Sequence, residues 1–173
     1  RLQEDRPGGK GTDLASGRTF FAVAHPDFGP PDSGGTRLAV PTLPGTRTEV
    51  HAITRLFSRS ELLLGAEARE TSLDRMAADG RLREFRFLHF ATHGLLDDRR
   101  PLASALVLAQ EPAAERGASS GRLTAEHIVR TWKLDPDLVT LSACETALGT
   151  YSGGEGFLGF SQALLLAGAR GTV

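Results

Sequence analysis

The sequence predicts a three-layer α/β fold with a mostly parallel central sheet and helices on both faces. Two apolar runs, Phe85 to Ala91 and Leu138 to Ala143, are too short for helices and rich in aromatic or branched residues, which is typical of buried parallel strands. Helical patterns alternate with such runs along the chain. Because connections between parallel strands are right-handed, the alternation favours a sheet covered on both sides.

The first half of the chain predicts strands and helices in alternation after a polar start. Residues 1–18 carry four glycines and no hydrophobic period, so we interpret them as a linker or domain boundary, followed by one domain over residues 19–173. The elements expected next are a strand at 19–24, a helix from Thr46 or Thr48 to about Ser58, a strand at 61–64 and a helix from a capping box at Thr71 to about Ala78.

The second half continues the pattern beyond the strand that ends at Ala91. A short strand at 104–109 is expected to pair with an extension near Arg122 and Leu123. The remaining elements expected are a helix capped by Thr124 and running to Arg130, a strand at 138–143, an apolar helix at 156–167 and a further strand beginning at 170–173.

Composition excludes several classes of function. The chain has 173 residues, of which 40% are hydrophobic, enough to bury the core of one domain. Its 20 basic and 21 acidic side chains give a net charge of −1 without a long block of either sign. Electrostatic capture of nucleic acid or of an anionic membrane is therefore not indicated.

The sequence has no candidate membrane span, no signal-peptide pattern and no second cysteine, which bears on its localisation and redox chemistry. No apolar run approaches the roughly 18 residues needed to cross a bilayer, and the amino terminus shows no signal-peptide pattern, so we expect a cytoplasmic protein. A single cysteine excludes internal disulfides and cysteine-rich zinc sites.

Two reactive side chains follow the two apolar strands. His93 comes directly after the first strand and Cys144 after the second, and in open α/β sheets chemistry gathers at the carboxyl ends of strands. A histidine about 50 residues before a lone cysteine is one arrangement of a cysteine nucleophile and its base. A thiol attacks a carbonyl as thiolate, so it needs such a base.

Other readings of these residues stay open. A cysteine in an apolar strand is usually a small buried hydrophobe. His89 lies within its strand and is expected to be a hydrogen-bonded core residue, whereas His25, beside Pro26, is either a turn residue or a third titrating group. His127 is expected to face solvent.

A third pattern, Gly154 to Gly159, satisfies G-x-G-x-x-G and raises the alternative of a dinucleotide site. It does not directly follow a strand, and Glu155 would place a carboxylate where pyrophosphate should bind. The glycines are therefore expected to allow close helix packing instead.

Six segments together resemble the CHAT family of caspase-like peptidases, bacterial domains usually fused to TPR repeats. They are LPGTRTEV (43–50), LHFATHG (88–94), SALVLA (104–109), LTAEHI (123–128), LVTLSACETALG (138–149) and GEGFLGFSQALLLAGARGTV (154–173). The resemblance implies a caspase-like fold, a catalytic dyad of His93 and Cys144, and TPR repeats in the parent polypeptide. Family members continue beyond the strand that begins near residue 170, so the carboxy-terminal part is expected to be incomplete.

The resemblance also implies the groups around the dyad. Gly94 has no side chain to block its N–H, so the backbone amides of Gly94 and Cys144 are expected to form the oxyanion hole. Caspase-like folds build the pocket for the substrate's P1 residue partly from positions that correspond here to Asp27 and Ser142. Asp27 would favour a basic P1 residue, although an aspartate after proline is as readily a turn former.

The function predicted is that of a cysteine endopeptidase that cleaves a protein substrate through Cys144 and His93, with no metal or organic cofactor. The alternative is a catalytically silent caspase-like scaffold that acts as a protein-interaction module with TPR repeats.

Overall fold

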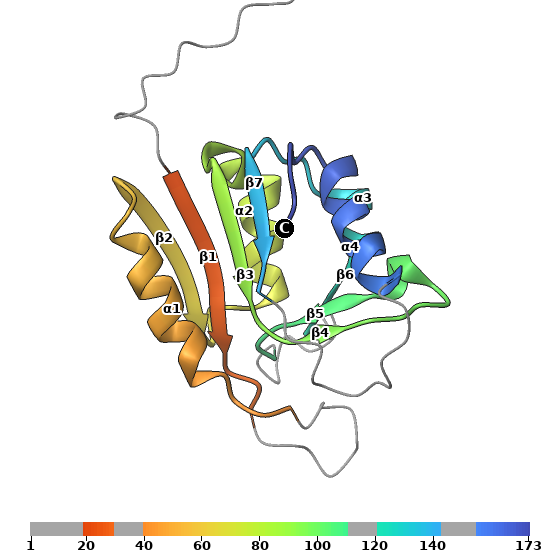
Figure 1. The fold of residues 1–173 in the computed structure, drawn as a ribbon, viewed down its shortest axis with the longest axis horizontal. Helices are drawn as coiled ribbons and strands as arrows, with labels where there is room; N and C mark the ends of the chain where they lie inside the picture. The colour runs from red at the N-terminus through yellow and green to blue at the C-terminus, as the bar shows by residue number, and fades with distance from the viewer. Residues whose placement is uncertain (1–18, 30–39, 111–120, 143–154) are drawn as a thin grey trace, which may run out of the picture.

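The fold has a four-stranded parallel sheet at its centre, with order β2-β1-β3-β7 (Figure 1). A computed structural model describes residues 19–29, 40–110, 121–142 and 155–173. The strands are β1 (Thr19–Pro26), β2 (Arg59–Gly65), β3 (Phe87–Ala91), β4 (Gly94–Leu95), β5 (Ala105–Val107), β6 (Arg122–Thr124) and β7 (Leu138–Leu141). The helices are α1 (Pro44–Thr54), α2 (Glu70–Ala78), α3 (Ala125–Thr131) and α4 (Glu155–Leu166), with short 3-10 turns at Arg81–Glu84 and Pro101–Ala103.

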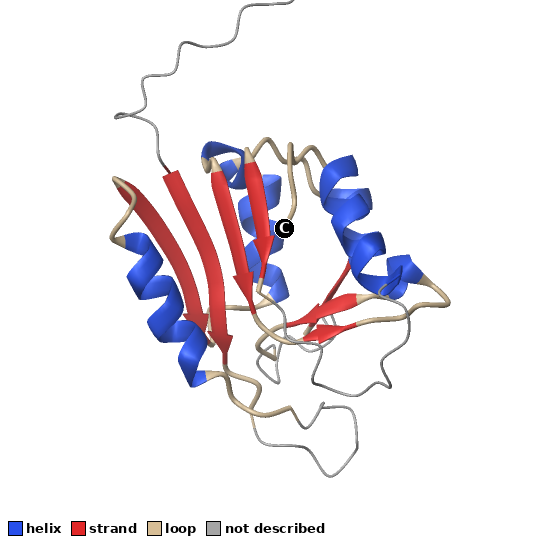
Figure 2. Ribbon diagram, viewed as in Figure 1, coloured by secondary structure: helices blue, strands red, loops and turns tan. Residues whose placement is uncertain are grey.

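Helices cover both faces of this sheet, as the sequence predicts (Figure 2). Alternate residues of a strand point to opposite faces, and β1 divides accordingly. Phe20, Ala22 and Ala24 pack with Val50 of α1, whereas Phe21 and Val23 join the larger core that α2, α3 and α4 cover. The three-layer α/β architecture is thereby confirmed and is consistent with a caspase-like fold.

A small antiparallel sheet, β4-β5-β6, lies near the carboxyl ends of the central strands (Figure 1). Leu106 of β5 pairs with Gly94 on one side and with Leu123 on the other. The predicted pairing of residues 104–109 with the extension near Arg122 is therefore confirmed. This sheet begins directly after His93 and so braces the chain there.

Two predicted helix starts are wrong. The first turn of α1 begins at Pro44, because Thr46 donates its hydroxyl to the Leu43 carbonyl instead of capping a later helix, and the helix ends at Thr54 rather than Ser58. The predicted capping box at Thr71 is absent, since α2 begins after Arg69, which makes no side-chain cap. The Thr124 cap is confirmed: its hydroxyl oxygen accepts a hydrogen bond from the His127 N–H at 3.1 Å.

The last residues of the chain lie beside β7. Thr172 forms a parallel bridge with Val139, and the Leu141 N–H donates to the Val173 carbonyl at 2.7 Å. The chain approaches this position through Gly168, whose φ of +117° is one that L side chains rarely adopt. The predicted strand near 170–173 is thus seen as a single bridge at the open side of β7.

Gly159 of the G-x-G-x-x-G pattern serves helix packing. A Cβ at this position would lie 2.3 Å from the Pro101 Cβ, so α4 contacts the 3-10 turn at Pro101–Ala103 only because residue 159 has no side chain. In the part of the chain that the structure describes, no helix combines the length and apolar character that a membrane span requires.

Candidate active site

The strands that lead to His93 and to Cys144 are direct neighbours. β3 and β7 pair in parallel, with Phe90 opposite Leu141, and the Ser142 N–H donates to the Phe90 carbonyl at 2.8 Å. The carboxyl ends of both strands therefore lie at one edge of the sheet. Cys144 itself lies outside the described residues, two positions beyond Ser142.

His93 is held in one orientation with one ring nitrogen unused. Its side chain is buried, and Nε2 lies 2.7 Å from the carbonyl oxygen of Pro41. A carbonyl can only accept, so Nε2 carries the proton and Nδ1 carries the lone pair. Nδ1 is buried and has no hydrogen-bond partner among the described residues. Buried polar atoms are normally paired, so this nitrogen is available to a further group at the site.

The backbone on both sides of the imidazole is fixed to β5. The His93 carbonyl accepts a hydrogen bond from the Val107 N–H at 2.8 Å, and the Thr92 hydroxyl donates to the Val107 carbonyl. The Phe28 ring packs against the imidazole with centroids 5.4 Å apart. Gly94, predicted to supply an oxyanion-hole amide, is buried at the start of β4 opposite Leu106. His93 is therefore positioned between β3 and β4 by backbone and side-chain contacts with β5.

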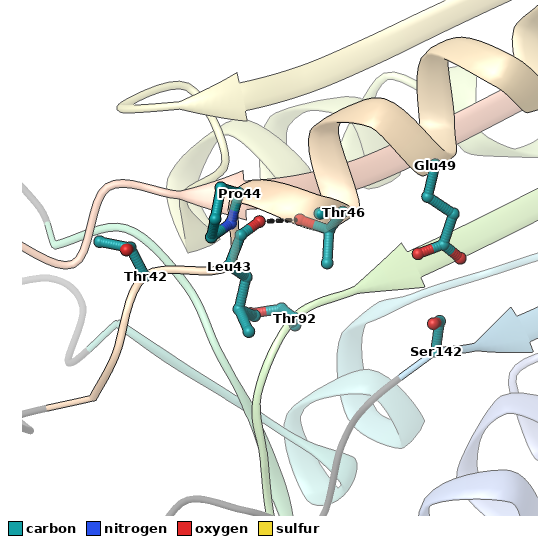
Figure 3. A pocket seen from close by; sticks show the side chains of 8 residues that line it. Thr42, Leu43, Pro44, Thr46, Glu49, Thr92 and Ser142 are labelled. Atoms are coloured by element: carbon teal, nitrogen blue, oxygen red, sulfur yellow. Dashed lines mark hydrogen bonds between the residues drawn. The ribbon is translucent and has the colours of Figure 1, made fainter.

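A pocket of about 320 Å³ lies at this edge of the sheet, between the first turn of α1, Thr92 and Ser142 (Figure 3). Its walls come from the segment that leads into α1, from the residue before His93 and from the end of β7: Thr42, Leu43, Pro44, Gly45, Thr46, Glu49, Thr92 and Ser142. Ser142, predicted to contribute to a substrate pocket, is among the residues that line this one. Its volume is at the lower end of the roughly 300–1,000 Å³ typical of ligand sites.

Glu49 is the ionisable residue among the described residues of this lining, and its side chain contacts His89 of β3. The Glu49 carboxylate accepts a hydrogen bond from the His89 Nε2–H at 3.0 Å, so the expectation of a hydrogen-bonded core histidine is confirmed. Burial lowers the pKa of the His89 imidazole below its usual value, although the Glu49 carboxylate acts in the opposite direction. The imidazole is therefore largely neutral at pH 7, and the pair keeps the negative charge of Glu49.

Asp27, the other predicted pocket residue, is exposed and is not among the residues that line the pocket. Its carboxylate accepts a hydrogen bond from the Gly29 N–H at 3.0 Å, the geometry of a turn former. The neighbouring His25 adopts a φ of +46°, and its N–H donates to the Thr46 hydroxyl at 3.0 Å. The end of β1 is thereby tied to the first turn of α1.

His127 corrects a prediction. It does not simply face solvent: its Nε2 lies 2.8 Å from the Asp74 carboxylate, which also accepts the Trp132 indole N–H at 3.1 Å. Glu70, Asp74 and His127 each offer one potential metal-ligand atom, and these three atoms lie within 4.8 Å of one another. The indole and imidazole contacts already explain the position of Asp74 as a link between α2 and α3.

Two groups at the site were missed by sequence reasoning. The Pro41 carbonyl, which fixes the His93 tautomer, is a backbone atom in a proline-rich segment and has no sequence signal. Glu49 lies within the segment LPGTRTEV that carries the family resemblance. Its sequence position does not reveal that it is close to β3, because that proximity arises only when α1 packs on the sheet.

An α/β sheet with a tautomer-fixed histidine after one strand, next to the strand that leads to the chain's single cysteine, is consistent with a caspase-like α/β fold. The CHAT domain family matches residues 3–173 of the chain. The chain therefore belongs to the CHAT family. No curated protein matches it significantly.

Proposed function

We propose that the protein is a cysteine endopeptidase that cleaves a protein substrate by acyl transfer, with Cys144 as nucleophile and His93 as general base. The observation that carries the proposal is the His93 imidazole, whose Nε2 proton is engaged by Pro41 while its buried Nδ1 lacks a partner among the described residues. An imidazole held as this tautomer presents a basic lone pair at the sheet edge toward which β7 also leads.

The chemistry follows from these groups. Nδ1 of His93 takes the proton from the Cys144 thiol, and the thiolate adds to the scissile carbonyl carbon, moving an electron pair onto the carbonyl oxygen. The backbone N–H groups of Gly94 and Cys144 are proposed to stabilise that oxyanion. When the C–N bond breaks, the imidazolium protonates the departing amine.

Hydrolysis of the thioester by the same two residues completes the catalytic cycle. His93 takes a proton from water, which adds to the thioester, and the C–S bond then breaks to release the carboxylic acid, while the imidazolium returns its proton to the sulfur and restores the thiol. No further oxidant, reductant or cofactor is needed for this balance. The Pro41 carbonyl stabilises the positive charge that His93 carries between the two steps.

Mass spectrometry of the full-length protein after treatment with a peptidyl chloromethyl ketone tests this proposal. Because the chain contains one cysteine, a thioether adduct on it is unambiguous. We expect an adduct on Cys144 in the wild type and a large loss of labelling in His93→Gln, which keeps an N–H donor for Pro41 but has no base. Absence of labelling on a protein that iodoacetamide modifies would favour the scaffold function instead.

A further inference from the structure

The pocket lies at the edge of the sheet where β3 and β7 end. Thr92 directly precedes His93, and Ser142 lies two residues before Cys144, and both line the pocket. This closeness in sequence to the two proposed dyad residues favours the pocket as the place for the substrate side chain next to the scissile bond.

The described lining of the pocket carries a negative charge. Among the described residues that line it, only Glu49 is ionisable, and its hydrogen-bond partner His89 is a buried imidazole that does not neutralise it at pH 7. In Figure 3 the Glu49 carboxylate extends from α1 toward the side on which the Ser142 hydroxyl lies at the end of β7. The Glu49 side chain is 37% exposed, so a bound group can reach it directly.

The remaining walls suit a long side chain with a polar end. Leu43 and Pro44 offer apolar surface to a methylene stem, as arginine and lysine stems commonly use. The hydroxyls of Thr42 and Ser142 offer hydrogen-bond acceptors to N–H donors. Asp27, an acidic residue that follows β1, is exposed and accepts a hydrogen bond within its own loop, and it is not among the described residues that line the pocket.

We propose that Glu49 makes this pocket selective for a cationic side chain, arginine or lysine, on the substrate residue whose carbonyl Cys144 attacks. The inference rests on the proposed peptidase function and names its substrate class. Glu49 acts here as a specificity-determining residue: its carboxylate binds the guanidinium or ammonium group, and it takes no part in bond making. An uncharged or acidic side chain leaves the carboxylate without a counter-charge and is disfavoured.

The experiment uses peptidyl chloromethyl ketones that differ only in the P1 residue, which is arginine, its uncharged isostere citrulline, leucine or aspartate. The rate of Cys144 modification in the full-length protein is measured by mass spectrometry for the wild type and for Glu49→Gln. Glutamine keeps a carbonyl oxygen for the His89 N–H, so the fold is retained. Glu126→Gln is the matched control, because Glu126 pairs with Arg130 on an exposed face of α3.

We expect the arginine probe to react about 10- to 100-fold faster than the citrulline probe, the range that a charge-assisted hydrogen bond supplies. Glu49→Gln should remove that preference by lowering the arginine rate to that of citrulline, and Glu126→Gln should keep it. Equal rates for arginine and citrulline in the wild type, or a preference that survives Glu49→Gln, would overturn the inference while leaving the peptidase proposal intact.

A binding measurement decides the case in which no probe labels Cys144, which would refute the peptidase proposal itself. N-acetyl-arginine amide and its citrulline counterpart are titrated into the protein and followed by NMR chemical shifts. Saturable shifts with the arginine ligand alone, lost in Glu49→Gln, would support a cation-selective pocket. No saturable difference between the two ligands would overturn it.

Discussion

Replacing Glu49 by alanine should destabilise the protein, whereas replacing it by glutamine should not. His89 is nearly completely buried, and its Nε2–H has the Glu49 carboxylate as its partner at 3.0 Å. Alanine leaves that donor without a partner where little water reaches it, which costs about 1–3 kcal/mol. Glutamine still accepts the hydrogen bond, so we expect a change within about 0.5 kcal/mol for Glu49→Gln.

Urea unfolding at pH 7.5, followed by circular dichroism, measures both free energies. The glutamine variant controls for the loss of charge, since it removes the negative charge and keeps the acceptor. If both variants lose the same free energy, the charge matters and the hydrogen bond does not. If neither loses any, His89 finds another partner and the contact between α1 and β3 is not structural.

Two further predictions concern stability. Burial lowers the pKa of His89 in the folded state, so as pH falls below the ordinary value of about 6.5 the unfolded chain takes up the proton first and the free energy of unfolding should fall. In urea titrations between pH 7.5 and 5, His89→Gln should show a shallower fall of that free energy than the wild type. An identical slope for the two proteins would contradict the lowered pKa. Gly168→Ala should cost about 1–3 kcal/mol or more, because its φ is +117° and a Cβ would lie 2.2 Å from the Leu134 carbonyl oxygen. Gly45→Ala, at a helical position with nothing within 4 Å of the added Cβ, is the control and should be neutral or stabilising in the same thermal unfolding assay; equal melting temperatures for the two variants would refute the close approach.

The central sheet could be predicted because the hydrophobicity of its strand segments is visible in the sequence. β1, β3 and β7 are continuous apolar runs, and such runs indicate strands that are buried on both faces. The positions of His93 and of the segment before Cys144 at one edge follow from the parallel pairing of β3 with β7, which the runs and the resemblance imply. Secondary-structure propensity and topology thus sufficed for the frame of the site.

The contacts that fix the site could not be predicted, because they join distant segments through backbone atoms or through a helix that crosses the sheet. The His93 imidazole meets a carbonyl at Pro41, and no residue type marks a carbonyl. Glu49 meets His89 only once α1 packs over β1. Helix starts failed for a local reason, since the hydroxyl of Thr46 turns back to Leu43 and no side chain caps α2.

The rate of alkylation of the single cysteine as a function of pH tests the central claim most directly. An isolated thiol with a pKa near 8.5 is only about 1% thiolate at pH 6.5. If the bare Nδ1 of His93 serves Cys144, the wild-type protein should react with iodoacetamide at pH 6.5 at least about tenfold faster than His93→Gln, whose profile should follow that of an ordinary thiol. Coincident profiles for the two proteins would show that His93 does not activate Cys144, and the proposed dyad would be wrong.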